Sequence, residues 1–151
     1  MSPRAACRLE TLRFDHVYDY VAGKADWLAR GLPTEGEYAA ARVGPLARDD
    51  VATCEIGAPV REARAAIERS PHGFGLVVAG DGTLLGRLRR SALGPALTVA
   101  DAMDPGPSTV RPNTTVESLR ERLDARRLRT AIVTTPEGRL LGVVTRDALG
   151  V

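Results

Sequence analysis

Two stretches of this chain carry the same pattern of apolar and polar positions. One is TCEIGAPVREARAAIERSPHGFGLVVAGDGTLLGRLRRSAL at 53–93, and the other is TVRPNTTVESLRERLDARRLRTAIVTTPEGRLLGVVTRDAL at 109–149. They align without gaps at a constant offset of 56 positions, and apolar positions match throughout although identical residues are sparse. Because the turns and the core positions share one register, the repeat predicts two units with the same fold.

Each unit contains an amphipathic helix that follows a short strand. Apolar residues recur three and four positions apart with charged residues between them, which is the pattern of a helix with one buried face. Thr115 precedes this pattern in the second unit, and Pro59, which suits the start of a helix, precedes it in the first. The apolar positions are Val60, Ala63 and Ile67 in the first unit and Val116, Leu119 and Leu123 in the second.

A β-hairpin and a short helix follow in each unit. The turns are predicted at Gly80-Asp81-Gly82 and at Pro136-Glu137-Gly138, because glycine tolerates the positive φ that such turns need. Each unit is therefore expected to run strand, helix, strand, strand, helix. Return strands and short helices are expected at 84–88 and 90–93 in the first unit and at 140–145 and 146–149 in the second.

One such unit is too small to bury a stable core, whereas two units can cover each other's sheets in a pseudo-two-fold arrangement. This order of elements, with STVRP at 108–112 and LLGVVTRDAL at 140–149, resembles a tandem pair of CBS domains, also called a Bateman module. The resemblance covers about two-thirds of the chain, from Leu46 to Val151. It implies an α/β fold of the α+β type, with β-α-β-β-α units at 51–105 and 106–151.

The first third of the chain resembles the C-terminal end of a rhodanese domain. The matching points are Ala5-Ala6, Leu12 to Phe14, Val17-Tyr18, Gly23, Trp27 and Gly31-Leu32-Pro33. The resemblance implies a helix-strand-helix extension over residues 1–33, followed by a linker over 34–50 with helical character around 38–42. Because the apolar residues of the extension need burial, we expect it to pack on the CBS pair or on a second subunit.

Catalysis of the rhodanese type needs a cysteine on a loop just ahead of this first helix, where backbone N–H groups and the helix N-terminus lower the thiol pKa. That loop would precede Met1, so no enzymatic activity is predicted. Cys7 falls inside the predicted helix and Cys54 inside a predicted strand, where cysteine is more often a small core residue. The alternative is a sulfurtransferase that uses Cys7 or a loop of a partner chain, and a longer protein would restore the missing half.

Composition narrows the partners that we expect. A net charge of +2 is too small to indicate nucleic-acid binding. RERLDARRLR at 120–129 is typical of a solvated helix face, with a phosphate-facing or partner-facing basic patch as the alternative. Two cysteines, with His16 and His72 isolated, fit no disulfide framework or zinc spacing, so no metal is predicted. No apolar stretch is long enough to span a membrane, and a cytoplasmic protein with reduced thiols is expected.

The CBS resemblance also implies a ligand site, because CBS pairs commonly bind adenosyl compounds in the clefts between their two units. Backbone groups at Thr109, Val110 and Ala131 are expected to hold the base. Thr145, at the end of the return strand, is expected to contact the ribose or a phosphate.

The family's ribose-binding aspartate, three residues farther on, has no match in either unit. Asp147 is the nearest acid after Thr145 and can serve only if the turn before the helix is one residue shorter. In the first unit Arg89 stands at the position of Thr145, and it can pair with phosphate, as can Arg87 and Arg90, but it cannot accept a hydrogen bond. The alternative is structural: Thr145 caps the next helix, and Asp147 stabilises the N-terminus of that helix electrostatically.

The sequence therefore predicts a non-catalytic regulatory module that senses a ligand. The expected ligand is an adenine nucleotide (AMP, ADP or ATP) or S-adenosylmethionine, and the expected assembly is a homodimer through the CBS helices. The alternative is a ligand-free CBS pair that serves only as a scaffold for protein assembly.

Overall fold

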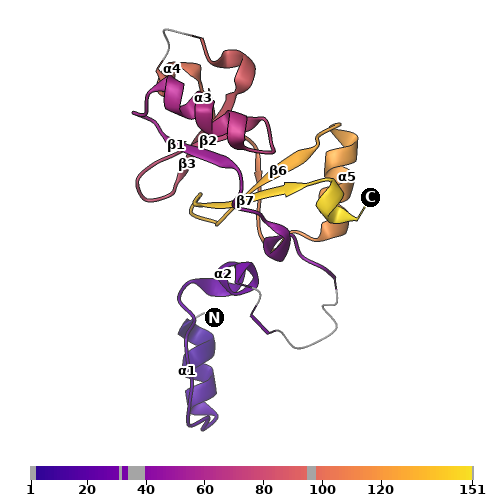
Figure 1. Cartoon of the computed structure of the whole chain (residues 1–151). Helices are drawn as coiled ribbons and strands as arrows, with labels where there is room; N and C mark the ends of the chain where they lie inside the picture. Colours follow the sequence, from indigo (N-terminus) through magenta and orange to yellow (C-terminus); the bar gives the residue numbers. More distant parts are fainter. Residues whose placement is uncertain (1–2, 31, 34–39, 95–97, 151) are drawn as a thin grey trace.

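The computed structural model describes residues 3–30, 32–33, 40–94 and 98–150. It contains a four-stranded sheet in the order β1-β2-β3-β4 and a three-stranded sheet in the order β5-β6-β7 (Figure 1). The strands are β1 (Ala52–Glu55), β2 (Phe74–Val78), β3 (Leu84–Arg89), β4 (Asp104–Pro105), β5 (Thr109–Val110), β6 (Thr130–Thr134) and β7 (Leu140–Thr145). The helices are α1 (Pro3–Thr11), α2 (Gly23–Ala29), α3 (Val60–Arg69), α4 (Val99–Ala102) and α5 (Val116–Ala125), with 3-10 turns η1 (Gly44–Leu46), η2 (Arg90–Ala92) and η3 (Asp147–Leu149).

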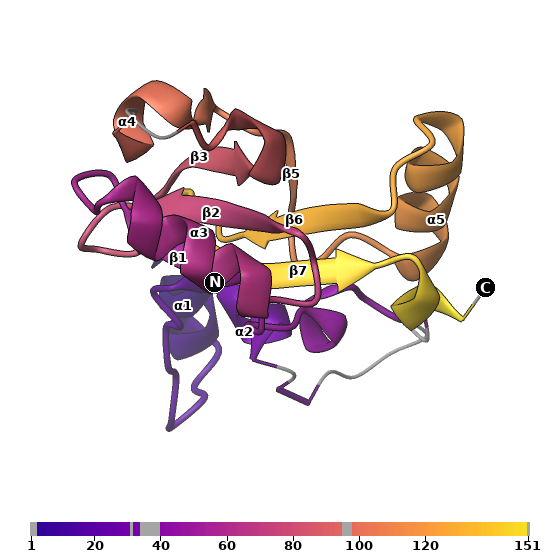
Figure 2. The ribbon, with the colours of Figure 1, turned by 45° about the horizontal axis from the view of Figure 1, so that its top comes forward.

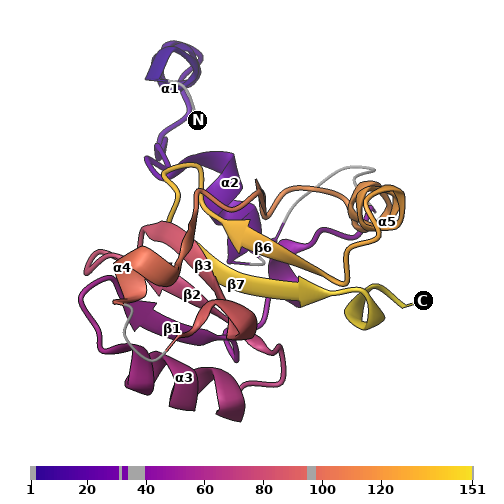
Figure 3. The ribbon, with the colours of Figure 1, turned by 90° about the horizontal axis from the view of Figure 1, so that it is seen from above.

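Each sheet carries one ten-residue helix on its outer face, α3 on the first sheet and α5 on the second. Figure 3 shows the two helices on opposite sides of the pair of sheets. The helical periodicity of the sequence selected the buried faces correctly, because five of its six apolar positions are buried and Val116 is partly buried against the same core. The buried five are Val60, Ala63, Ile67, Leu119 and Leu123.

The two hairpins have the same register, residue for residue, which confirms the predicted repeat. Phe74 pairs with Arg89 across β2 and β3, and the equivalent residues Thr130 and Thr145 pair across β6 and β7. Both ladders are also irregular at the equivalent place, just before the last residue of β2 and of β6. The offset of the sequence repeat therefore holds in the backbone.

The two units face each other about a pseudo-two-fold axis. Leu84 N donates to Gly138 O, and the equivalent Leu140 N donates to Gly82 O, each at 3.0 Å. Beside this reciprocal pair, buried residues of both units form one apolar cluster between the sheets, which lie side by side in Figure 2. The cluster consists of Val51, Leu76, Ile132 and Val143. The predicted fold class, two small units that bury their sheets against each other, is confirmed.

Residues 42–48, which the sequence analysis assigned to a linker, are built into the second unit. Arg48 and Val143 exchange two backbone hydrogen bonds of 2.9 and 2.8 Å. Val43 is fully buried in the core beneath α5. The helix expected around 38–42 lies partly outside the described residues, and the described residues 40–42 are not helical, because Arg42 forms an antiparallel bridge with Thr115. The division of the chain at residues 33, 50 and 105 stays a prediction.

The equivalent segment ahead of the second unit crosses to the first unit in the same way. Asp104 of β4 pairs with Arg87 of β3, and these residues are the counterparts of Arg48 and Val143. Val99 of α4, the counterpart of Val43, is also fully buried. Each unit is therefore completed by the segment that precedes the other unit, which ties the pair together twice.

Gly142 shows how closely these crossing segments approach. Its φ is +140°, and a Cβ on its Cα would lie 2.3 Å from the carbonyl oxygen of Arg48. At the equivalent Gly86 the nearest backbone atom to such a Cβ would be Asp104 O at 3.1 Å. Glycine is required where the second unit meets its crossing segment, because any side chain there would collide with backbone.

The N-terminal extension consists of α1 and α2 without the strand expected between them. Residues 12–22 form turns and irregular backbone. The rings of Tyr20 and Trp27 meet edge to face at 5.2 Å, and Trp27 Nε1 donates to Pro33 O at 2.9 Å, so these two aromatic residues pack within the extension.

The extension contacts the paired units through one of its two helices. α2 lies against η1, whereas α1 projects from the rest of the chain in Figure 1. Phe14, Tyr18 and Val21 are 59%, 80% and 92% exposed. The main contact of the extension with the pair is therefore made by α2, and burial against a second subunit stays a prediction. Gly31, one of the rhodanese-like positions, lies outside the described residues.

Candidate functional site

A cleft of about 310 Å³ lies between the two units, and both units contribute to its wall. Arg87 and Arg89 alternate along β3, so both side chains leave the same face of the first sheet. Leu128, which precedes β6, and Thr130, its first residue, come from the second unit. We call this cavity the inter-unit cleft; its remaining lining residues are Asp104, Pro107, Ser108 and Ile132.

Arg89 in the inter-unit cleft can exchange its carboxylate partner for another anion. Arg89 Nε lies 2.8 Å from Asp104 Oδ2, with 60% and 55% of the two side chains exposed. An ion pair this exposed contributes little stability, so an incoming anion can displace the carboxylate at small cost. Arg87 lies with its guanidinium carbon 5.8 Å from the centre of the Phe74 ring, which holds the side chain across the sheet face.

Part of the wall of the inter-unit cleft is apolar. Leu128 is 41% exposed, whereas Ile132 is 5% exposed. The Ser108 hydroxyl accepts a hydrogen bond from Arg122 Nη2 at 2.6 Å, which leaves its O–H group as a donor for a ligand. A flat apolar group inserted here would contact Leu128 and the hydroxyl-bearing side chain of Thr130.

Three of the residues expected to hold a base lie next to the cleft and do not line it. Val110 and Ala131 are 5% and 8% exposed and face the core beneath α5. Thr109 of β5 pairs with Ile132 of β6. Because side chains alternate along a strand, Thr130 and Ile132, the two neighbours of Ala131 in β6, face the cleft. Ser108, which precedes β5, also lines it.

Thr145 and Asp147 do not line the inter-unit cleft with Arg89. Thr145 Oγ1 accepts a hydrogen bond from Ala148 N at 3.3 Å, which is the capping role that the sequence analysis gave as the alternative. Asp147 is exposed at the start of η3. The six expected ligand residues therefore do not converge on one cavity, and Arg89 is the one that lines the cleft.

The counterpart of the inter-unit cleft in the repeat is occupied by the chain's own side chains. His72 stands at the position of Leu128, its side chain is 6% exposed, and its Nε2 lies 2.8 Å from Asp50 Oδ1. Arg48 Nη2 lies 2.7 Å from the other oxygen of the same carboxylate. We call Arg48, Asp50 and His72 the closed site. The sequence analysis treated His72 as isolated, because Asp50 is 22 positions away.

Both partners of Asp50 favour its charged form. The hydrogen bond from His72 is the main reason that the pKa of Asp50 lies below its ordinary value, and Arg48 acts in the same direction. The ionised carboxylate therefore keeps His72 in place at neutral pH. Arg48, Asp50 and His72 thus form a connected set of side chains at the place where the other half of the repeat has the inter-unit cleft.

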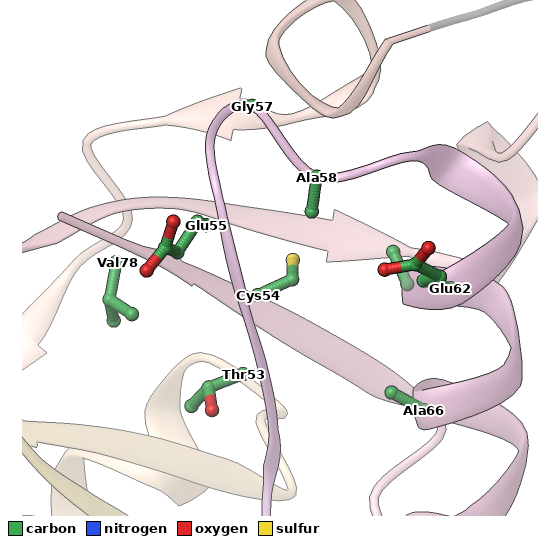
Figure 4. Close-up of a pocket in the computed structure, with 9 residues that line it drawn as sticks. Thr53, Cys54, Glu55, Gly57, Ala58, Glu62, Ala66 and Val78 are labelled. Atoms are coloured by element: carbon green, nitrogen blue, oxygen red, sulfur yellow. The ribbon is translucent and has the colours of Figure 1, made fainter. Parts of the chain in front are cut away.

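A second and larger cavity, of about 730 Å³, lies beside Cys54 at the edge of β1 (Figure 4). Burial raises the pKa of the Cys54 thiol, and its Sγ lies 3.8 Å from Leu76 O. A protonated thiol is a poor nucleophile. Cys7 is exposed on α1. Within the described ranges, no three His, Cys, Asp or Glu side chains are grouped so as to hold a metal ion, and no helix is long and apolar enough to cross a membrane.

Comparison with known proteins identifies one half of the repeat by sequence and the whole pair by shape. Residues 99–149, which run from α4 to the end of the second unit, match the family model of the CBS domain. The first unit has the same fold and lies outside that match. A search of curated proteins returned no match.

The structural neighbours are CBS-pair proteins. The cytosolic domain of the Mg²⁺ channel MgtE in complex with ATP is 27% identical, with a TM-score of 0.64, over 72% of this chain and 47% of that chain. CBSX2, an Arabidopsis thaliana protein, in complex with AMP is 22% identical, with a TM-score of 0.64, over 72% and 92%. The CBS domains of a transcriptional regulator from Streptococcus pneumoniae are 18% identical, with a TM-score of 0.63, over 72% and 95%.

These matches support the CBS part of the sequence analysis. A CBS domain is found in the chain, and the paired arrangement matches that of CBS-pair structures. The chain spans about half the length of the MgtE structure. The rhodanese resemblance of residues 1–33 gains no support from these comparisons and stays a prediction.

Proposed function

We propose that this chain is a non-catalytic regulatory module that binds an adenosine phosphate in the inter-unit cleft. The observation that carries the proposal is the convergence of Arg87 and Arg89 from the first unit with Leu128 and Thr130 from the second in one cavity. The 27% identical MgtE domain was solved in complex with ATP, which supports a nucleotide of this class.

The two arginines of the cleft suit the phosphate end of such a ligand. A guanidinium binds two phosphate oxygens at once through parallel N–H donors. Arg89 leaves Asp104 when the phosphate arrives, since the exposed ion pair holds it weakly. Arg87, two residues earlier on the same face, reaches a neighbouring phosphate.

The apolar end of the cleft suits the base. A purine ring placed against Leu128 removes exposed apolar surface from water, and Thr130 offers a hydroxyl at the edge of the ring. The resemblance implies that backbone groups of Thr109, Val110 and Ala131 contact the base, and this expectation is part of the proposal.

Recognition through phosphate separates the nucleotides from S-adenosylmethionine. The sulfonium centre of S-adenosylmethionine is positively charged, so the two arginines oppose it. The equivalent of a ribose-binding aspartate in the first unit is Ala92, which cannot accept hydrogen bonds from the ribose hydroxyls. We therefore expect affinity to rise with the number of phosphates, from AMP to ADP to ATP.

Binding across the cleft acts on the relative arrangement of the two units, and this is the basis of the proposed regulation. A ligand that contacts both units favours the arrangement in which the two walls are at the right distance, so it shifts the population of any other arrangement. The homodimer through α3 and α5 is part of this proposal, because a dimer partner would receive that change.

Thermal unfolding with a ligand series tests the proposal. ATP, ADP, AMP and S-adenosylmethionine are added to the wild type at equal concentrations. Each nucleotide is expected to raise the free energy of unfolding by RT ln(1 + [L]/Kd), and therefore to raise Tm, with the largest shift for ATP. Inorganic triphosphate without a base serves as the control for charge alone and is expected to bind more weakly than ATP. A flat response to all three nucleotides would favour the ligand-free scaffold.

A further inference from the structure

Phe74, the first residue of β2, is in contact with both the inter-unit cleft and the closed site. The guanidinium carbon of Arg87, which lines the inter-unit cleft, lies over the Phe74 ring at 5.8 Å from its centre. The ring centres of Phe74 and His72 are 6.0 Å apart, and the two planes are tilted by 49°. One aromatic side chain therefore connects a cleft residue with a residue of the closed site.

The register of the first sheet explains why Arg87 lies over this ring. Phe74 pairs with Arg89, and Leu76 pairs with Arg87, across antiparallel β2 and β3. Side chains two positions apart along a strand leave the same face, so Phe74 and Arg87 are diagonal neighbours on that face. Because the face of an aromatic ring attracts a cation, Phe74 favours one placement of the Arg87 guanidinium.

Phe74 is itself held on two sides. It is partly buried and packs against the apolar cluster between the two sheets. His72, which contacts its ring, has a side chain that is 6% exposed, and His72 Nε2 lies 2.8 Å from Asp50 Oδ1. A displacement of His72 away from Phe74 would break this hydrogen bond. The closed site thus holds in place the ring that lies beside Arg87.

This arrangement belongs to the first unit alone. The equivalent positions of the second unit hold neither an arginine nor an aromatic ring. They are occupied by Leu128, Thr130 and Val143, the counterparts of His72, Phe74 and Arg87. The arginine that lines the cleft and the two rings that support it therefore occur together in one unit and are replaced together in the other.

We propose that Phe74 and His72 are positioning residues for the phosphate end of the ligand, so that the closed site acts on the inter-unit cleft through Arg87. This inference rests on the proposed function, which assigns Arg87 to a ligand phosphate. A guanidinium binds two phosphate oxygens only when its plane is aligned with them. An Arg87 side chain that is already placed in the empty cleft loses less conformational freedom when the phosphate binds, which strengthens binding.

The placement of Arg87 is tested first without a nucleotide. The ring current of Phe74 acts on the Nε–H group of Arg87, so Phe74→Leu is expected to move the NMR signal of that group, and Phe74→Tyr, which keeps the ring, is expected to leave it near the wild-type position. Phe14→Leu, at the other phenylalanine of the chain, is the matched control and is expected to move nothing, because Phe14 is 59% exposed on the extension. An Arg87 signal that is identical in Phe74→Leu and the wild type would overturn the proposal.

His72→Ala tests the part assigned to the closed site. Loss of the ring that contacts Phe74 is expected to shift the Arg87 signal in the same direction as Phe74→Leu, by a smaller amount. An unchanged signal in His72→Ala would show that the closed site does not act on Arg87.

Isothermal titration with ATP and with adenosine tests the effect on binding. Phe74→Leu is expected to weaken ATP binding about threefold, which is the size of a cation–π contact at an exposed site, and to leave adenosine binding unchanged, since adenosine carries no phosphate. Phe74→Tyr is expected to retain wild-type affinity for both. Equal losses for ATP and adenosine would indicate a merely structural role and overturn the proposal. A wild type that binds no ATP would overturn the proposed function together with this role, whereas normal ATP binding in Phe74→Leu would overturn the positioning role alone.

Discussion

The inter-unit cleft and the closed site are the same place in the two copies of one backbone. In the first, Leu128 leaves its position partly exposed, and in the second, His72 fills that position and is held by Asp50. Arg89 ends the return strand at the cleft, and Thr145 ends it at the closed site, where it caps η3. The difference teaches that a shared fold fixes where a site can form, while a few side chains decide whether that place holds a ligand or protein.

The two units also differ at the outer edges of their sheets, where the side chains at equivalent positions differ in charge. The edge of the second sheet carries Arg111 and Arg122, and the edge of the first sheet carries Glu55 beside the short side chain of Ala66. The first unit therefore presents an open anionic pocket on its outer edge. Each unit thus fills one kind of space that the other leaves open.

The largest expected effect concerns Gly142, where the backbone of residues 42–48 comes closest to the second unit. Gly142→Ala should lower the free energy of unfolding by about 3 kcal/mol or more, because the new Cβ meets the carbonyl of Arg48 at a φ of +140°. Gly138→Ala is the matched control; its φ of +90° is also positive, but the nearest side-chain atom to its Cβ is 3.8 Å away, so a loss of about 1 kcal/mol is expected. Urea unfolding measures both. Equal losses would show that the close approach of residues 42–48 is not what constrains Gly142.

The next effect separates the two ends of the return strands. Arg89→Ala should weaken ATP binding at least tenfold, because a charge-assisted hydrogen bond to phosphate is lost, a loss of about 1.5–3 kcal/mol. Arg90→Ala is the control, since Arg90 faces Glu68 at 3.6 Å and does not line the cleft. Isothermal titration gives both affinities. Similar losses in the two variants would mean that net charge, and not the cleft, binds the nucleotide.

Acid stability distinguishes the closed site from the open one. The pKa of Asp50 is lowered in the folded chain by His72 and Arg48, so its contribution is present above the ordinary carboxyl pKa of about 4 and is lost as pH falls through the lower folded value. Asp50→Asn removes this contribution, so its Tm should lie below that of the wild type at pH 7 and approach it as the pH falls below about 4. Asp104→Asn is the matched control at the open cleft. A Tm difference for Asp50→Asn that stays constant across this range would contradict the assignment.

The smallest effect is expected at the residue that the family resemblance favours. Thr145→Val should change ATP affinity no more than twofold, because the Thr145 hydroxyl is engaged with Ala148 N and does not line the inter-unit cleft. The loss of this cap should instead lower stability by about 1 kcal/mol. Titration and thermal unfolding of the same sample separate the two results. A tenfold loss of affinity without a loss of stability would restore Thr145 to the ligand site.

The sequence predicted the repeat, the buried faces of α3 and α5 and the hairpins, because each depends on local periodicity or on turn residues. It did not predict the crossing of residues 42–48, since a short segment that pairs with a strand about a hundred positions away has no periodic signal. It expected backbone groups at Ala131 of β6 to contact the base, whereas the side chains of β6 that line the cleft are those of Thr130 and Ile132; a strand that is buried on both faces offers no polar side from which to predict them. The contact between Asp50 and His72 was not predicted because the two residues lie 22 positions apart in the sequence.

The number of nucleotides bound per chain tests the central comparison most directly. Isothermal titration of the wild type with ATP is expected to give one site per chain, with binding lost in the Arg87→Ala and Arg89→Ala double variant. Two equivalent sites per chain would contradict the account, because the space held by Arg48, Asp50 and His72 would then be open to ligand after all. One site that survives in the double variant would contradict it equally, since the nucleotide would then lie outside the cleft that the two arginines define.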